Sequence, residues 1–189
     1  MEGAVGGRDR RGSQLGGGEV IEAVLAFFSV GAAGIPMIGF LILMVLLDRY
    51  DREPIWLVSV VFLWGALGAI VIAVVGSLFF MIPISLVASD GAADLAGTVL
   101  IAPLVEEPAK ALGVLLGAFS RHFDNATRGC VYGAAAGVGV GMTENGRYFI
   151  GAAFEGDVAG WVGTVFVRTL FTAMMHACAT SIVGAAIGW

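Results

Sequence analysis

The chain has 189 residues, of which 58% are hydrophobic and only 13% are charged, and its net charge is −5. An ordinary soluble domain carries about twice that charged fraction, and here the apolar residues fall in long blocks, so a soluble globular protein is excluded. The basic residues are too few and too scattered for a nucleic-acid-binding surface. The composition indicates an integral membrane protein embedded in a lipid bilayer.

Residues 1–19 are rich in Gly and Arg and predict a disordered tail, ahead of a transmembrane helical domain at residues 20–189. Each apolar segment of this domain exceeds the roughly 20 helical residues that cross a hydrocarbon core. We expect these segments at about 20–47, 55–87, 95–119, 128–153 and 161–187. A kink is expected at Gly34-Ile35-Pro36 and a break near Pro83, because proline removes a helical hydrogen bond. The predicted fold class is all-α: a polytopic transmembrane bundle of about five spanning helices.

The loops between these segments differ in charge. Arginines at 49, 52, 121 and 128 lie in or beside alternate loops, and the two intervening loops carry only acids. The positive-inside rule therefore places the loops at 48–54 and 118–128 in the cytoplasm, although an arginine cluster at 8–11 opposes this orientation. The stretch from Asp48 to Glu53 is expected to be a solvated loop.

The last three segments contain polar and ionisable residues that are costly inside a bilayer and therefore indicate function. They are Glu106, Glu107 and Lys110 in the third, Glu144, Asn145, Arg147 and Tyr148 in the fourth, and Arg168 and His176 in the fifth. Lys110 follows Glu106 by four residues and Glu107 by three, so it can pair with either on one helix face. Arg168, Thr172, His176 and Thr180 form one stripe at four-residue spacing. We predict a single buried polar cluster on helices three to five.

Glycines at 133, 137 and 141 recur at four-residue intervals in the fourth segment, ahead of Asn145. Small residues at this spacing let two helix backbones approach closely. Two interpretations stay open: a plain packing seam, or a seam that draws Glu144 and Asn145 against the helix that carries the chemistry.

Three stretches occur in order on successive segments. They are Glu106-Glu107-Pro108-Ala109-Lys110, then Tyr132-Gly133 through Glu144-Asn145 and Tyr148, then Arg168 with His176 and Thr180. Together they resemble the PrsW family of intramembrane proteases, relatives of the CAAX prenyl endopeptidases, over roughly residues 40–185. Asp48 to Pro54 looks like the acidic, proline-containing link of that family. Members often continue with further helices, so a chain truncated at its C-terminus and a natural end at Trp189 are both open.

The resemblance implies an intramembrane endopeptidase that cuts a membrane-anchored protein, in the plasma membrane of a prokaryote, with Glu106, Glu107 and His176 carrying the reaction. Glu106 is expected to be the general base that activates water, with Glu107 assisting or ligating. Glu144 is expected to orient or ligate, and His176 to ligate or to stabilise the oxyanion. The supporting residues are Lys110, Asn145 as an oxyanion donor, Arg168 as the counter-charge to the acids, and Thr180.

A metal is an open alternative. Glu107, Glu144 and His176 match the ligand count of a divalent metal such as zinc, but the HExxH spacing of soluble zinc proteases is absent. A metal-free water activated by a glutamate is the other alternative. Two rival functions also stay open: a non-catalytic membrane scaffold of the same fold, and a proton-coupled carrier. A carrier predicts an inverted repeat of helices, whereas the polar groups here lie only in helices three to five.

Overall fold

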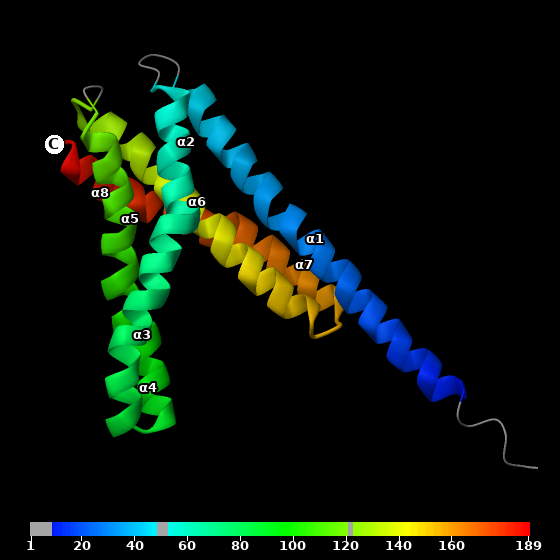
Figure 1. The fold of residues 1–189 in the computed structure, drawn as a ribbon. Coiled ribbons are helices and arrows are strands. Elements are labelled where there is room, and N and C mark those ends of the chain that lie inside the picture. The colour runs from blue at the N-terminus through cyan, green and yellow to red at the C-terminus, as the bar shows by residue number, and fades with distance from the viewer. Residues whose placement is uncertain (1–8, 49–52, 121–122) are drawn as a thin grey trace, which may run out of the picture.

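The computed structural model describes residues 9–48, 53–120 and 123–189, and within these ranges the chain is helical with no strand (Figure 1). The helices join into five rods, three of which contain a π-helical turn (η). The rods are α1 (Asp9–Leu47); α2 (Ile55–Leu63), η1 (Trp64–Ala69) and α3 (Ile70–Val87); α4 (Asp90–Ala96), η2 (Gly97–Ile101) and α5 (Ala102–Ala118); α6 (Ala126–Ala153); and α7 (Val158–Val167), η3 (Arg168–Thr172) and α8 (Ala173–Ile187). The all-α prediction is confirmed.

Three of the described helical stretches are long and apolar enough to cross a membrane: Gly17–Leu47, Ile55–Val87 and Val158–Ile187. They coincide with the first, second and fifth predicted spans. The rods at 90–118 and 126–153 match the third and fourth predicted spans as helices, and they carry the ionisable groups. That these two rods also span the bilayer stays a prediction.

The ends and interruptions of the helices differ in part from the prediction. Helix α1 begins at Asp9, so residues 9–19 are helical where a disordered tail was predicted, and residues 1–8 lie outside the described ranges. The predicted break near Pro83 is wrong, since α3 continues through it to Val87. Membrane helices tolerate proline where local adjustments satisfy the freed carbonyl. Helix α1 also continues through Pro36, where a kink and not a break was predicted, and that kink stays a prediction.

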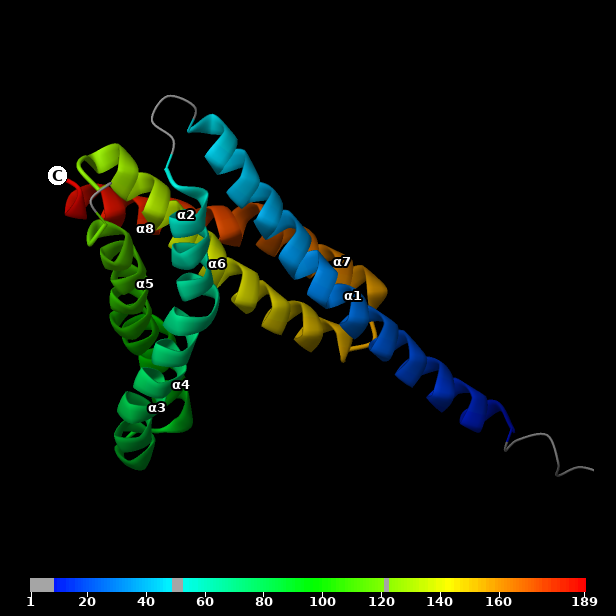
Figure 2. The ribbon, with the colours of Figure 1, turned by 45° about the horizontal axis from the view of Figure 1, so that its top comes forward.

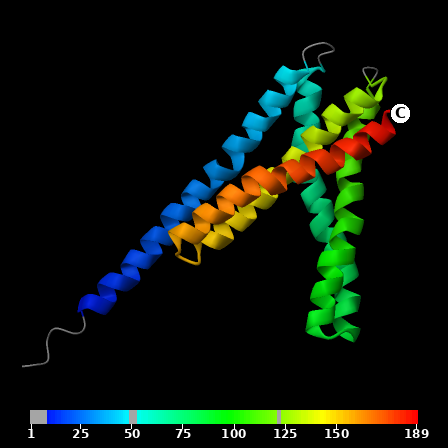
Figure 3. The same ribbon diagram turned by 180° about the vertical axis from the view of Figure 1, so that it is seen from behind.

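The rods form two groups that meet near α2 and separate toward the opposite end (Figures 1 and 2). One group contains α1, α6 and the rod of α7 and α8; the other contains α3, α4 and α5. Figure 3 shows the same separation from behind. Helix α6 contacts α8, α1, α2 and α5 and is therefore the centre of the fold.

Close packing of α6 on α8 depends on glycine. A Cβ atom at Gly133 would overlap the carbonyl oxygen of Thr180, and one at Gly137 would overlap that of His176. Gly129 makes the same kind of approach to Gly184 one turn earlier. The predicted glycine seam is thus a backbone-to-backbone contact, and it lies directly against the helix that carries His176.

Glu53 contradicts the prediction of a solvated loop. Its side chain is buried, it accepts a hydrogen bond from the hydroxyl of Tyr132, and its Oε1 lies 3.1 Å from Nε of Arg128. Tyr132 is fully buried on α6. Residues 49–52 lie outside the described ranges. A carboxylate that sequence reasoning placed in water therefore joins the start of α2 to α6.

Candidate active site

One turn of α5 carries the paired glutamates and their counter-ion. Lys110 is 2% exposed, and its Nζ lies 2.7 Å from Oε1 of Glu107 and 3.6 Å from Oε2 of Glu106. A buried ammonium is stable only with such partners. Because the shorter contact is to Glu107, the carboxylate of Glu106 is the less tightly held of the two.

Lys110 also connects α5 to α8. Its Nζ lies 3.3 Å from Nδ1 of His176, and Nε2 of His176 lies 2.9 Å from Oε2 of Glu144 on α6. An ammonium group can only donate, so Nδ1 accepts this hydrogen bond and the ring proton lies on Nε2, which donates to Glu144. The predicted residues of three helices thereby form one chain of hydrogen bonds, in which His176 links Lys110 to Glu144.

Arg168 contacts the same carboxylate oxygen of Glu144 as His176 does. Its Nη2 lies 3.4 Å from Oε2 of Glu144, and its Nε donates to Oδ1 of Asn145 over 3.2 Å. Asn145, which is fully buried, returns a long hydrogen bond of 3.5 Å to the carbonyl oxygen of Arg168. The guanidinium also stacks on the ring of Tyr148, with 3.5 Å between Cζ and the ring centroid. Arg168 begins the π-helical turn η3, and such turns occur frequently at functional sites.

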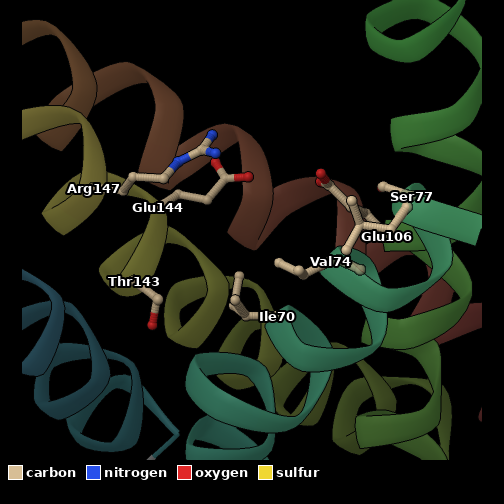
Figure 4. A pocket seen from close by; sticks show the side chains of 9 residues that line it. Ile70, Val74, Ser77, Glu106, Thr143, Glu144 and Arg147 are labelled. Atoms are coloured by element: carbon tan, nitrogen blue, oxygen red, sulfur yellow. The ribbon is translucent and has the colours of Figure 1, made fainter. Parts of the chain in front are cut away.

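A cavity of about 300 Å³ opens beside this network. Its walls are Ile70, Ala73, Val74, Ser77 and Leu78 of α3, Glu106 of α5, and Thr143, Glu144 and Arg147 of α6. Figure 4 shows the carboxylates of Glu106 and Glu144 facing one another across it. Glu107 and His176 are not among the lining residues. The two carboxylates are therefore the acidic groups that a molecule in this cavity would meet.

The hydroxyl groups of Thr180 and Thr143 donate hydrogen bonds to backbone carbonyl oxygens and not to the ionisable side chains of the site. The hydroxyl of Thr180 donates to the carbonyl oxygen of His176 over 2.9 Å, within α8. The hydroxyl of Thr143 donates across the helix interface to the carbonyl oxygen of Ala66 in η1, over 2.6 Å. Sequence reasoning did not single out Thr143, because nothing in the sequence locates a π-helical turn on a neighbouring helix.

Comparison with known proteins shows the family to which the chain belongs. The model of a family described as PrsW family intramembrane metalloprotease matches residues 53–189. The chain belongs to this family. It is also 29% identical over 163 residues to Protease PrsW of Bacillus subtilis (strain 168), which covers 85% of this chain and 68% of the relative. No solved structure matches the chain.

Because the chain belongs to the PrsW family, it is an integral membrane protein with the function of a membrane protease. Its environment is a lipid bilayer, and its substrates are proteins. The matched region begins at Glu53 and includes every predicted site residue. It therefore also includes the three helices, α5, α6 and α8, that meet in the hydrogen-bonded network.

The family description names a metal, and the arrangement of the donors can be tested against it. A histidine binds a metal through an unprotonated ring nitrogen. In this arrangement Nδ1 of His176 is engaged by Lys110 and Nε2 carries the proton donated to Glu144. Glu107 pairs with Lys110, and no group of three His, Cys, Asp or Glu side chains converges within the described ranges. The donors in this arrangement do not fit a metal. Metal ligation by Glu107, Glu144 and His176, which the resemblance implied, stays a prediction.

Proposed function

We propose that the chain is an intramembrane endopeptidase that hydrolyses a peptide bond of a membrane-anchored protein, with water activated by Glu106. The observation that supports this most directly is the position of the Glu106 carboxylate, which faces Glu144 across a cavity between α3 and α6. A cavity of about 300 Å³ has room for a peptide bond and a water molecule, whose share of liquid volume is about 30 Å³.

The reaction has two stages in this proposal. Glu106 removes a proton from water while the water oxygen attacks the carbonyl carbon, and the carbonyl π electrons become an oxyanion. The oxyanion then re-forms the carbonyl, the carbon–nitrogen bond breaks, and protonated Glu106 gives its proton to the departing amine. Glu106 returns to its starting state, so the cycle needs no other reagent than water.

The surrounding network supplies a fixed electrostatic frame for this proton transfer. Lys110 is hydrogen-bonded to Glu107 and lies within 3.6 Å of Glu106, so Glu107 neutralises most of the ammonium and leaves Glu106 free to accept a proton. Glu144 is held by His176 and by Arg168, which fixes its carboxylate opposite the base. Preorganised groups of this kind need no rearrangement at the moment of reaction.

The substrate class follows from the walls of the cavity. Apart from Ser77, α3 contributes aliphatic side chains, and α3 packs against α5 rather than closing onto α6. An apolar segment of a membrane-anchored protein fits such a wall, with the carbonyl carbon of the cleaved bond facing the water that Glu106 activates. In a prokaryotic cell the corresponding site of action is the plasma membrane.

The test uses the full chain reconstituted in liposomes with a panel of single-pass membrane proteins. Glu106→Gln keeps size and hydrogen bonding but removes the base, so cleavage should disappear while thermal unfolding in detergent stays close to wild type. Glu107→Gln is the matched control on the same turn, and it should lower the rate less than Glu106→Gln, because Glu107 does not line the cavity.

Cleavage that persists in Glu106→Gln would contradict the assignment of the base. Cleavage by neither well-folded protein would contradict the protease proposal and favour the non-catalytic scaffold. A chelator arm addresses the metal: the arrangement of donors predicts that cleavage survives chelation, and a loss restored by added zinc would show that the site rearranges to bind one.

A further inference from the structure

Arg147 stands apart from the other basic side chains that the structure describes. Lys110, Arg128 and Arg168 each lie within 4 Å of a carboxylate. Arg147 has no such partner in the described part of the chain, although it is on the α6 helix one turn after Glu144. A charged group without a partner is costly inside a bilayer, and α6 is a predicted span, so the presence of Arg147 there indicates a role.

The position of Arg147 indicates what that role involves. Its side chain lines the same cavity as Glu106 and Glu144, and Figure 4 shows it beside Glu144, on the wall opposite Glu106. A nucleophile approaches a carbonyl carbon at slightly more than a right angle to the C=O bond, so a carbonyl attacked from the Glu106 side does not present its oxygen to the base. An oxygen directed to the α6 wall meets Arg147, the basic residue among the lining side chains.

The donors that the sequence predicted for the oxyanion are already engaged. The side-chain amide of Asn145 is fully buried and bonds to Arg168 through both of its polar atoms. Both ring nitrogens of His176 bond to other side chains, and neither His176 nor Asn145 lines the cavity. Among the residues that line the cavity, Arg147 is the cationic donor available to a tetrahedral intermediate.

We propose that Arg147 is a further catalytic residue, which binds the oxyanion of the tetrahedral intermediate. This inference rests on the proposed function. When Glu106 takes the proton of water it becomes neutral, and the negative charge passes to the carbonyl oxygen on the far side of the cavity. The total charge of the site is unchanged, but one unit moves from α5 toward α6, where a guanidinium without an acidic partner stabilises it.

The contact of Arg147 with Tyr148 does not account for its position. Its Cζ lies 5.1 Å from the centroid of that ring, whereas Arg168 stacks on the same ring at 3.5 Å. Arg168 is therefore the principal cation partner of Tyr148. Arg147 keeps its five donors for a group that enters the cavity.

The experiment compares Arg147→Met and Arg147→Lys with wild type in proteoliposomes, on the membrane protein that the cleavage panel identifies. Arg147→Met should lower kcat by about 10²–10³-fold with little change in KM, since an oxyanion donor acts in the transition state. Arg147→Lys should recover part of kcat. Asp94→Asn removes an exposed charge from α4, outside the site, and should leave both constants unchanged.

A second measurement separates this role from a structural one. A transmembrane peptide with a phosphinate in place of the cleaved bond carries a charged oxygen like that of the intermediate, and a peptide with a reduced, uncharged linkage does not. Arg147→Met should lose affinity for the phosphinate peptide by about the same factor as kcat and retain affinity for the uncharged one.

Each remaining outcome overturns the inference in a recognisable way. An equal loss of affinity for both peptides would make Arg147 a ground-state binding residue. A kcat that depends on the anionic lipid content of the liposome rather than on the phosphinate would assign the guanidinium to a lipid phosphate. Cleavage at wild-type rate by Arg147→Met would remove Arg147 from the reaction while leaving the proposed function intact, and no cleavage by wild type would remove both.

Discussion

Lys110 of α5 donates a hydrogen bond across a helix interface to His176 of α8, with 3.3 Å between Nζ and Nδ1. The same ammonium group pairs with Glu107 on its own helix, and the same imidazole contacts Glu144 on α6. One buried positive charge therefore fixes the relative positions of three helices and the ring orientation of the histidine. The first two predictions follow from this contact.

Replacing Lys110 by methionine should abolish cleavage and destabilise the fold. The variant keeps the apolar stem of the side chain but leaves Glu106 and Glu107 without their counter-ion and Nδ1 of His176 without its donor. We expect a loss of about 2–3 kcal/mol in unfolding free energy, below the value for a fully buried pair because both glutamates are partly exposed. Chemical denaturation in detergent measures this. Leu112→Met, at an exposed position of α5, is the control, and equal stability of the two variants would contradict the prediction.

Replacing His176 by glutamine should lower activity more than stability. Glutamine can restore one of the two hydrogen bonds to Lys110 and Glu144 but cannot bridge both over the same distance. The loss of one such bond corresponds to about 1–2 kcal/mol, and we expect kcat to fall by about tenfold or more. Proteoliposome assays corrected for the folded fraction measure it. An unchanged kcat would show that His176 neither positions Glu144 nor takes part in the reaction.

The sequence predicts the helices and most of the polar network for one physical reason. A bilayer imposes a long apolar run on each span, so the few ionisable residues inside such runs are conspicuous, and helical spacing shows which of them share a face. Glu106, Glu107 and Lys110 were found in this way, as was the stripe from Arg168 to Thr180. The catalytic roles assigned to them, and the metal, stay predictions.

What the sequence could not predict depends on contacts between helices. Glu53 is in a charged stretch and reads as solvated, but its burial against Tyr132 is set by how α2 meets α6. The α3 wall of the cavity consists mostly of aliphatic residues with no distinguishing pattern. Arg147 appeared to be one more member of the cluster, and only the ion pairs of its neighbours show that it has no acidic partner in the described ranges. The continuation of α3 through Pro83 likewise depends on local backbone adjustment.

The glycine seam between α6 and α8 predicts a sharp difference between two chemically identical substitutions. Gly137→Ala places a Cβ atom against the backbone carbonyl of His176, so α8 must move away. We expect a loss of about 1–3 kcal/mol in unfolding free energy and a lower rate of cleavage. Gly151→Ala on the same helix adds a Cβ atom with open space around it and should stabilise by about 0.5–1 kcal/mol. Thermal unfolding compares the two, and similar effects would show that the seam does not govern packing.

The contact between Tyr132 and Glu53 makes the final prediction, and it concerns stability at a distance from the cavity. Tyr132→Phe removes one hydroxyl from a buried carboxylate that Arg128 continues to pair. A hydrogen bond to a charged group contributes about 1.5–3 kcal/mol, so we expect a loss in that range in chemical denaturation. Tyr148→Phe is the control, because its hydroxyl has no hydrogen-bond partner in the described residues, and it should change stability by less than about 0.5 kcal/mol.

A double-mutant cycle makes this prediction specific to the pair. If the hydroxyl acts through Glu53, then Tyr132→Phe should cost much less in a Glu53→Gln background, since the charge that strengthens the bond is gone. Additive losses would mean that the hydroxyl acts independently of the Glu53 charge, and no loss in either background would mean that Tyr132 stabilises the fold through its ring alone, which stacks on Phe123 with 6.0 Å between centroids. The start of α2 would then be positioned on α6 by apolar packing and not by a buried carboxylate.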